Sequence, residues 1–511
     1  MLRTIKQSSG VFLLLALLGS VVPLPEKPGK MYVSGYENVL GTSLELKIAA
    51  MSAQQAARAE DAALAEIDRL NHILSSYDST SEFCRWMKAD KKPVTVSPEL
   101  YEVLSLFEQW RLKSKGALDA AAETVSKVWA EAAKKNRLPP PGDIAGAVEA
   151  VRQPHYMLNK QNHTVTRLSD ASLILNSFAK SYIMNKASHA AMGCAGVTAL
   201  VMNIGGDILV RGGHTEQIRV SDPKADAENS LPVAAVSVRN KTIATSGNYR
   251  RGVLIGGKWY SHIVDPRTGW PAGEVISATV VADSAADAGA LATALNVLGP
   301  DEGSRLAASV PGAEYLLIMA DGRQVQSRGW EKIKILEALT RDGGDDDAVR
   351  PPVKDKMWDP DYELVVSLQL ATVEGVRIHR PFVAVWVIDA YKKPVKQLAV
   401  WYGKSRWLTE LSSWHYAYYQ DFSAGNSSIM STTSATRPPG KYTLRWDGRD
   451  DKGNLLPQGS YTVYMEAARE QGTHQLMSKE IIIQKPQHID MAGGTEIAAA
   501  SLDYRKKTDG K

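Results

Sequence analysis

The chain has 511 residues, of which 44% are hydrophobic and 23% are charged. This length allows about three domains of ~150 residues, and the apolar fraction excludes a chain that is disordered throughout. The formal net charge of +4 argues against a nucleic-acid binder or a polybasic membrane protein. The two cysteines, Cys84 and Cys194, exclude a disulfide scaffold and a four-cysteine zinc site, and they leave a single disulfide open.

The first 25 residues have the pattern of an export segment. Arg3 and Lys6 precede an apolar run at 11–18, which is shorter than the roughly 20 residues that a membrane-spanning helix needs. We therefore expect residues 1–25 to be a signal peptide, or an N-terminal anchor that associates the chain with a membrane. A buried N-terminal helix is the alternative.

Residues 30–340 mix helical and strand patterns, and we expect them to form one domain. The alternation at 42–48 is typical of a strand, and the apolar run at 198–204, which ends at a glycine pair, is typical of a buried strand. Helical spacing of apolar residues predicts helices at 52–74 and 284–298, the second of which Gly299-Pro300 should stop.

The charges, glycines and prolines at 341–356 predict a linker, and the pattern changes after it. Short β-rich runs separated by turn residues predict an all-β sandwich over 357–485, followed by a polar, frayed tail at 486–511. Half of the 12 tryptophans lie in this region. They fit sandwich core packing better than an aromatic binding groove.

Residues 442–463 resemble a motif of immunoglobulin-like domains of the flagellar-hook-assembly type. Asp450 and Asp451 lie in its hairpin turn, and a solvated hairpin explains them better than a Ca2+ site. The resemblance concerns the fold, and our hypothesis is that this domain is a spacer or a module that docks a protein.

Two polar clusters in the first domain are candidates for chemistry. His262 and Asp265 lie three residues apart in a Pro- and Gly-bounded segment, where a histidine can act as a base and a carboxylate can orient it. A structural hydrogen-bonded pair is the alternative. The second cluster places Asp207 after a glycine pair, which is a weak signal by itself.

Taken together, these clusters resemble the FAD:protein FMN transferase (ApbE) family, whose members carry N-I-G-G-D, T-S-G-N/D-Y and H-I-x-D-P-x-T-G-x-P segments in that order. Other family motifs also match, and order and spacing agree over residues 33–335. The matching segments are Leu40–Thr42, Ser76–Glu82, Gly116–Asp119, Phe178–Lys180, Asn203–Asp207, Thr245–Tyr249, His262–Pro271 and Ala290–Leu295.

The resemblance implies an α+β domain that binds FAD, uses a divalent metal, usually Mg2+, and transfers FMN to a Ser or Thr hydroxyl of an exported acceptor protein. We expect His262 to take the proton from that hydroxyl and Asp265 to orient His262 or hold the turn. Together with the N-terminal segment, the resemblance implies that the protein lies in the bacterial periplasm or on the periplasmic face of the membrane. The residues assigned to FAD are Leu40, Tyr77, Ala117, Leu118, Asp119, Lys180, Asp207, Thr245, Ser246, Gly247 and Ile263. The residues assigned to the metal are Ser177, through its main-chain carbonyl, and Thr293, through its hydroxyl.

One metal ligand of the family pattern is missing. The family carries an Asp four residues before the threonine, where both side chains share one helix face, and this chain has Gly289 there. Asp287 is the nearest carboxylate, but two residues along a helix is a rotation of ~200°. Ser284 and Asp287 fit an N-terminal capping box instead, although a shifted helix start would restore Asp287 as a ligand. The family's glycine after the lysine is Ser181.

The sequence therefore leaves three functions open. The retained segments favour a flavin transferase with a modified metal shell, since Mg2+ keeps waters and substrate phosphates as ligands. Gly289, and Met87 where the family has an asparagine, favour a non-catalytic FAD-binding or flavin-carrier protein. An FAD pyrophosphatase would use the same site with water as the acceptor.

Overall fold

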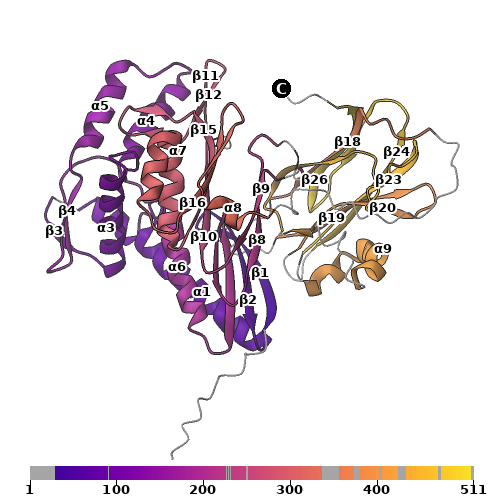
Figure 1. Cartoon of the computed structure of the whole chain (residues 1–511), viewed down its shortest axis with the longest axis horizontal. Coiled ribbons are helices and arrows are strands. Elements are labelled where there is room, and N and C mark those ends of the chain that lie inside the picture. Colours follow the sequence, from indigo (N-terminus) through magenta and orange to yellow (C-terminus); the bar gives the residue numbers. More distant parts are fainter. Residues whose placement is uncertain are drawn as a thin grey trace, which may run out of the picture.

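The computed structural model describes residues 29–89, 91–225, 227, 229–230, 232–248, 251–335, 356–372, 380–402, 405–423, 433–434, 436–469 and 473–507. They form an N-terminal domain of helices and strands beside a C-terminal β domain (Figure 1). The expected signal peptide or anchor at 1–25 lies outside the described residues, as does all but the last residue of the expected linker at 341–356.

An eight-stranded antiparallel sheet forms the centre of the N-terminal domain. Its order is β1-β2-β6-β7-β10-β15-β16-β17. The strands are β1 (Lys30–Val39), β2 (Thr42–Ala50), β6 (Val197–Ile204), β7 (Asp207–Gly212), β10 (Thr242–Gly247), β15 (Val275–Ala282), β16 (Glu314–Met319) and β17 (Gln324–Gln326). The strands expected at 42–48 and 198–204 are confirmed as β2 and β6.

Helices cover one face of this sheet (Figure 1). They are α1 (Ala53–Leu74), α2 (Glu82–Met87), α3 (Pro98–Lys113), α4 (Ala122–Lys134), α5 (Pro141–Arg152), α6 (Ala179–Met192) and α7 (Ala285–Ala308). The helix expected at 52–74 is confirmed as α1, capped by the Ser52 hydroxyl. The helix expected at 284–298 is confirmed: Gly299 has a φ of 68° and a non-helical conformation that ends this stretch, and Pro300 then starts the second helical stretch of α7.

The opposite face of the sheet is covered by the hairpin of β8 (Glu216–Val220) and β9 (Ala234–Val238) and by the short α8 (Trp330–Ile333), whose Trp330 is fully buried. This layer lies on the side of the β domain (Figure 1). The remaining strands form small sheets at the edges of the domain. These are β3 (Pro93–Thr95), β4 (Tyr156–Asn159), β5 (Thr164–Arg167), β11 (Gly252–Ile255), β12 (Lys258–Ser261), β13 (Val264–Asp265) and β14 (Trp270–Pro271).

Two sheets enclose the core of the C-terminal domain, with orders β22-β18-β26-β25 and β21-β20-β19-β23-β24. The expected all-β class is confirmed, with a short helical insertion packed against the outer face of the second sheet. The elements are β18 (Tyr362–Leu370), β19 (Phe382–Asp389), β20 (Pro394–Trp401), the 3-10 helix η2 (Ser405–Glu410), α9 (Ser412–Ser423), β21 (Thr433–Ser434), β22 (Gly440–Trp446), β23 (Gly459–Ala468), β24 (His474–Ile483), β25 (Gln487–Ala492) and β26 (Ile497–Lys506).

The prediction of a frayed tail at 486–511 is wrong. Residues 487–492 form β25, and residues 497–506 form β26, which pairs with β18 over its whole length and lies inside the first sheet. Ala500, Leu502 and Tyr504 alternate into the core, and the polar residues between them, Ser501 and Asp503, are less buried. The polar composition of this segment is therefore that of strands with one exposed face.

The expected packing role of the tryptophans is confirmed where their side chains are described. These side chains are 2% exposed or less, and they are Trp358, Trp386, Trp401, Trp414 and Trp446. In the acidic turn, the Asp450 carboxylate accepts hydrogen bonds from the backbone amides of Lys452 (3.0 Å) and Asn454 (2.8 Å), which fits the hairpin interpretation.

The two domains touch through a loop of the N-terminal domain. The Asn229 side chain donates to the Arg445 carbonyl (2.7 Å) and accepts from the Arg445 amide (2.9 Å), so it pairs with edge strand β22 as a neighbouring strand would. Both cysteines are free thiols. In the part of the chain that the structure describes, every helix is too short or too polar to cross a membrane.

Candidate active site

Asp207 is the centre of a polar cluster under the helical layer. It is the first residue of β7, and Leu209, two residues further on, belongs to the core on the helix side, so both side chains point to that face. The carboxylate accepts hydrogen bonds from the Ser181 hydroxyl (3.2 Å) and from the Thr245 amide. Burial raises the pKa of Asp207, although the Lys180 ammonium and these hydrogen bonds oppose the shift. The structure thus brings together three of the residues that the sequence assigns to FAD.

Thr245, Ser246 and Gly247 are the last residues of β10, beside β15. The Thr245 hydroxyl is hydrogen-bonded to that of Thr279 (3.0 Å), while Asn296 of α7 donates to the Ser246 carbonyl (3.2 Å). Asn296 is a contact that the sequence analysis missed. Its signal is a polar residue, buried to 2% exposure, one helical turn beyond Thr293.

The implied metal ligands do not form a complete set. Ser177 lies in the turn before α6, and the Thr293 hydroxyl donates to the Gly289 carbonyl within α7 (3.2 Å). Gly289 supplies no carboxylate, and the helix start is not shifted, because the Ser284 hydroxyl caps α7 through the Asp287 amide (3.2 Å). Among the described residues, no group of three or more His, Cys, Asp or Glu could hold a metal ion. The implied Mg2+ site therefore lacks its carboxylate ligand, and the Ser177 carbonyl and the Thr293 hydroxyl are the implied ligands that remain.

His262 lies on the protein surface directly after β12. Its Nδ1 is 3.0 Å from the Arg251 carbonyl, and a carbonyl oxygen can only accept, so Nδ1 carries the proton and Nε2 keeps a free lone pair. Desolvation by neighbouring atoms lowers the pKa of His262. A neutral, exposed imidazole of this kind can accept a proton from a hydroxyl group.

Asp265 does not orient His262 by a hydrogen bond. Its two carboxylate oxygens bind the Arg267 guanidinium at 2.9–3.2 Å, and one of them also accepts from the Arg267 amide (2.9 Å). Arg267 in turn pairs with Glu302 of α7 (2.9 Å). Of the two expected roles, the contacts favour holding the turn. Arg267 itself was missed, and its place two residues after an aspartate in a turn was the available signal.

The turn that follows His262 packs closely against the helices. Ile263, which the sequence assigns to FAD, is 8% exposed, and its carbonyl accepts from the Ala272 amide (2.8 Å). The Trp129 indole of α4 donates to the Gly269 carbonyl (2.8 Å). A Cβ at Gly269 would lie 2.5 Å from the Ile144 side chain of α5, and its φ is 77°, so only glycine fits there.

Leu40 and Tyr77 lie on turns, where Leu40 is partly buried against the core and Tyr77 is exposed. Leu40 occupies the β1–β2 turn with a φ of 53°, an unusual conformation for a non-glycine residue. The ring of Tyr77 is 78% exposed, and its hydroxyl accepts from the Asn176 side chain, next to Ser177. An exposed aromatic face beside α6 is available to stack on a flat ring.

Ala117, Leu118 and Asp119 are buried rather than open to solvent. The Asp119 carboxylate accepts from the Ala121 amide (2.8 Å) and lies 3.5 Å from the His155 ring. These side chains support the loop, and an FAD contact through them would need the main chain or a rearrangement.

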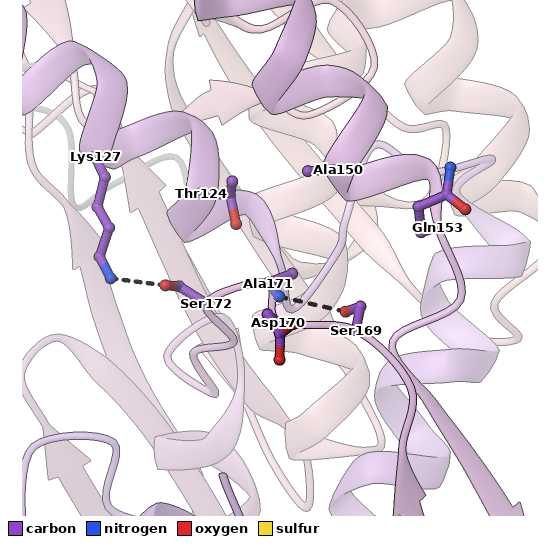
Figure 2. A pocket seen from close by; sticks show the side chains of 8 residues that line it. All are labelled: Thr124, Lys127, Ala150, Gln153, Ser169, Asp170, Ala171 and Ser172. Carbon is purple, nitrogen blue, oxygen red and sulfur yellow. Dashed lines mark hydrogen bonds between the residues drawn. The ribbon is translucent and has the colours of Figure 1, made fainter. Parts of the chain in front are cut away.

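A hollow of ≈ 400 Å³ lies elsewhere on the helical layer (Figure 2). Lys127 crosses it to donate to the Ser172 hydroxyl (2.7 Å). Its lining contains none of the residues that the sequence assigns to FAD or metal: Thr124, Lys127, Ala150, Gln153, Ser169, Asp170, Ala171 and Ser172. The chemistry assigned above therefore gives this hollow no role.

Two family models match this chain. The ApbE family model matches residues 40–317, and the model of a predicted periplasmic protein family (DUF2271) matches residues 363–499. The FAD:protein FMN transferase of Treponema pallidum is 31% identical over 272 residues, which cover 49% of this chain and 74% of that protein. The enzyme of that name from Klebsiella pneumoniae is 26% identical over 323 residues, which cover 59% of this chain and 91% of that protein.

The crystal structure of the ApbE protein of Thermotoga maritima shares the fold. It superposes with a TM-score of 0.53 at 24% identity, and the match covers 60% of this chain and all of that one. The family model spans more than half of the chain, including the Asp207 cluster and the His262 turn. The chain therefore belongs to the ApbE family.

Proposed function

We propose that the N-terminal domain transfers FMN from FAD to a Ser or Thr hydroxyl of an exported acceptor protein. The observation that carries this proposal is His262, an exposed imidazole whose Nδ1–H is held by the Arg251 carbonyl and whose Nε2 is free. The relatives that match this domain are named FAD:protein FMN transferase, which supports the same reaction. Gly289 is the observation for the flavin-carrier alternative, and a pyrophosphatase would use the same His262 with water as the acceptor, but the names of the relatives favour the transferase over both.

The reaction needs one proton acceptor. The acceptor hydroxyl oxygen attacks the phosphorus on the FMN side of the FAD pyrophosphate, a P–O bond forms, and the P–O bond to AMP breaks. The hydroxyl proton passes to Nε2 of His262, and AMP leaves with the electrons of the broken bond. Arg251 fixes the imidazole tautomer through its carbonyl, so the free nitrogen is available for this proton.

The Asp207 cluster is suited to hold the pyrophosphate through Lys180. The Lys180 ammonium is the cation next to the Asp207 carboxylate, and Ser181 and Thr245 hold that carboxylate in place. An ammonium whose position is set by a carboxylate can also balance phosphate charge. Asp207 would then act by positioning Lys180.

Mg2+ enters this proposal only as an ion that the family pattern implies. Ser177 and Thr293 would be its protein ligands, and it would balance phosphate charge if bound. Because the carboxylate of α7 is absent, we assign no step to the ion.

We also propose a periplasmic location, which the description of the DUF2271 family supports. The C-terminal domain that matches this family would act as a spacer or dock a protein. The N-terminal segment would direct export or associate the chain with the membrane face.

The test is incubation of the full chain with FAD, Mg2+ and an acceptor domain. Covalently fluorescent acceptor on a denaturing gel supports the transferase, free FMN with AMP indicates the pyrophosphatase, and unchanged bound FAD indicates the carrier. His262→Gln should lower transfer by about 10²–10⁴-fold, the usual contribution of a general base. His488→Gln, an exposed histidine of the β domain, is the matched control and should have no effect.

A further inference from the structure

Helices α6 and α7 approach each other closely at one point. A Cβ at Gly289 of α7 would lie 2.6 Å from the Ser181 hydroxyl oxygen and 3.3 Å from the Phe178 Cβ. The first distance is well below a van der Waals contact. The position on α7 that faces the Asp207 cluster is thus already occupied by a side chain of α6.

The same Ser181 hydroxyl also binds Asp207, at 3.2 Å. Ser181 is 1% exposed, and a rotation that cleared the space beside Gly289 would remove this hydrogen bond from a carboxylate that burial already disfavours. The hydroxyl therefore has two roles: it fills the space beside α7, and it stabilises the carboxylate at the start of β7.

We propose that Ser181 and Gly289 are a matched pair that closes the cation position on α7. In this chain the hydroxyl of α6 replaces a carboxylate of α7, so the protein by itself holds a divalent cation only weakly. The inference rests on the proposed function only in assigning this cluster to FAD. Its consequence is that neither residue can be exchanged for the family's residue alone.

The test uses electron paramagnetic resonance to measure Mn2+ binding to the full chain without FAD. It compares the wild type, Ser181→Gly, Gly289→Asp and the double variant. We expect the double variant to bind Mn2+ at least tenfold more tightly than the wild type. Gly289→Asp alone should gain less, because its new side chain meets the Ser181 hydroxyl. A wild type that binds as tightly as the double variant would overturn the proposal, and so would a single Gly289→Asp variant that equals it.

A steric control separates a closed position from a failure to fold. Gly289→Ala adds only the Cβ, so its melting temperature should fall, and Ser181→Ala in the same chain should restore it by removing the hydroxyl. A Gly289→Ala variant as stable as the wild type contradicts the clash. The matched pair is contradicted if the double variant Ser181→Gly with Gly289→Asp keeps the wild-type melting temperature and gains no Mn2+ affinity. Flavin transfer is measured separately, so loss of the proposed activity would leave these outcomes unaffected.

Discussion

Buried carboxylates in the two domains have different surroundings. In the β domain, Glu363, Glu466 and Glu496 are 4% exposed or less. The Glu363 carboxylate accepts hydrogen bonds from the Arg445 guanidinium at 2.8 and 3.0 Å. Both carboxylate oxygens of Glu496 accept a hydrogen bond from Arg469 Nε, each at 2.9 Å. In the N-terminal domain, Asp207 has a serine hydroxyl, one backbone amide and a nearby ammonium instead.

Glu466 shows how fully the β domain satisfies such a group. Its oxygens accept from the backbone amides of Ser413 (3.0 Å) and Trp414 (2.8 Å) at the start of α9, and they bind the His474 ring at 2.7 Å. The carboxylate therefore holds the helical insertion against the sheet. It is an architectural group, because protein donors complete its hydrogen bonds.

The difference supports the proposal that the N-terminal domain is the one that binds a ligand. A carboxylate held by an arginine fork has its negative charge neutralised within the protein. Asp207 is held by weaker donors at the start of β7, and these donors do not fully offset the burial that raises its pKa. We expect substitutions of the two kinds of carboxylate to separate stability from function.

The largest expected effect is on the stability of the β domain. Glu496→Ala should lower the free energy of unfolding by about 3–5 kcal/mol, since it leaves the Arg469 guanidinium without its carboxylate partner in a buried site. Urea unfolding measures it. Asp490→Ala, at an exposed carboxylate on β25, is the matched control and should cost about 0–1 kcal/mol. Equal losses in the two variants would contradict the architectural role.

Asp207→Asn should do the reverse. Flavin transfer should fall by about 10²-fold, the size of effect expected when a reacting group is misplaced. The melting temperature should hold or rise, because the amide removes a carboxylate that burial disfavours. A variant that loses stability and keeps its transfer rate would place Asp207 with the architectural carboxylates.

The same pair of proteins gives a prediction about pH. Because the folded-state pKa of Asp207 lies above its ordinary value of 3.8, the folded protein binds this proton more tightly than the unfolded chain. Wild-type stability relative to Asp207→Asn should therefore rise as pH falls from the raised pKa towards 3.8. Unfolding curves over this range measure the difference, and a relative stability that falls on acidification would contradict the sign.

A smaller effect concerns the pH dependence of transfer. Desolvation lowers the pKa of His262 below its ordinary value of 6.5, and the base acts in its neutral form. The transfer rate should therefore reach its plateau at neutral pH and fall on acidification with a midpoint below 6.5. Single-turnover rates at saturating FAD measure the midpoint. A midpoint above 6.5 would mean that a carboxylate or another group governs the proton transfer.

The smallest expected effect is at the contact between the domains. Asn229→Ala removes two hydrogen bonds to strand β22, and at an exposed site we expect a loss of about 1 kcal/mol in the free energy of unfolding. Asn162→Ala, in the hairpin between β4 and β5, is the control for a loop asparagine with local bonds only. If the two variants behave alike, the contact does not stabilise the pair of domains.

The sequence by itself determined the elements whose signals are local. The helix over 52–74, the hydroxyl cap of Ser284, the alternation in β2 and the apolar run of β6 were all found where the patterns predicted them. The motifs were enough to identify the family, because each motif is a short segment that can be read directly from the sequence. The roles assigned to Ser177, Lys180 and His262 stay predictions, since the ligands that would test them are FAD and its acceptor.

Only the tertiary structure decided the contacts between distant segments. The polar run after residue 486 forms a strand because β18 supplies a partner, which no local pattern reveals. Asp265 pairs with Arg267 rather than His262 because the turn directs its carboxylate there. Gly289 could be recognised as a missing carboxylate from sequence. Only the packing of α6 against α7 shows that the Ser181 hydroxyl occupies the place of that carboxylate and that the same hydroxyl is hydrogen-bonded to Asp207.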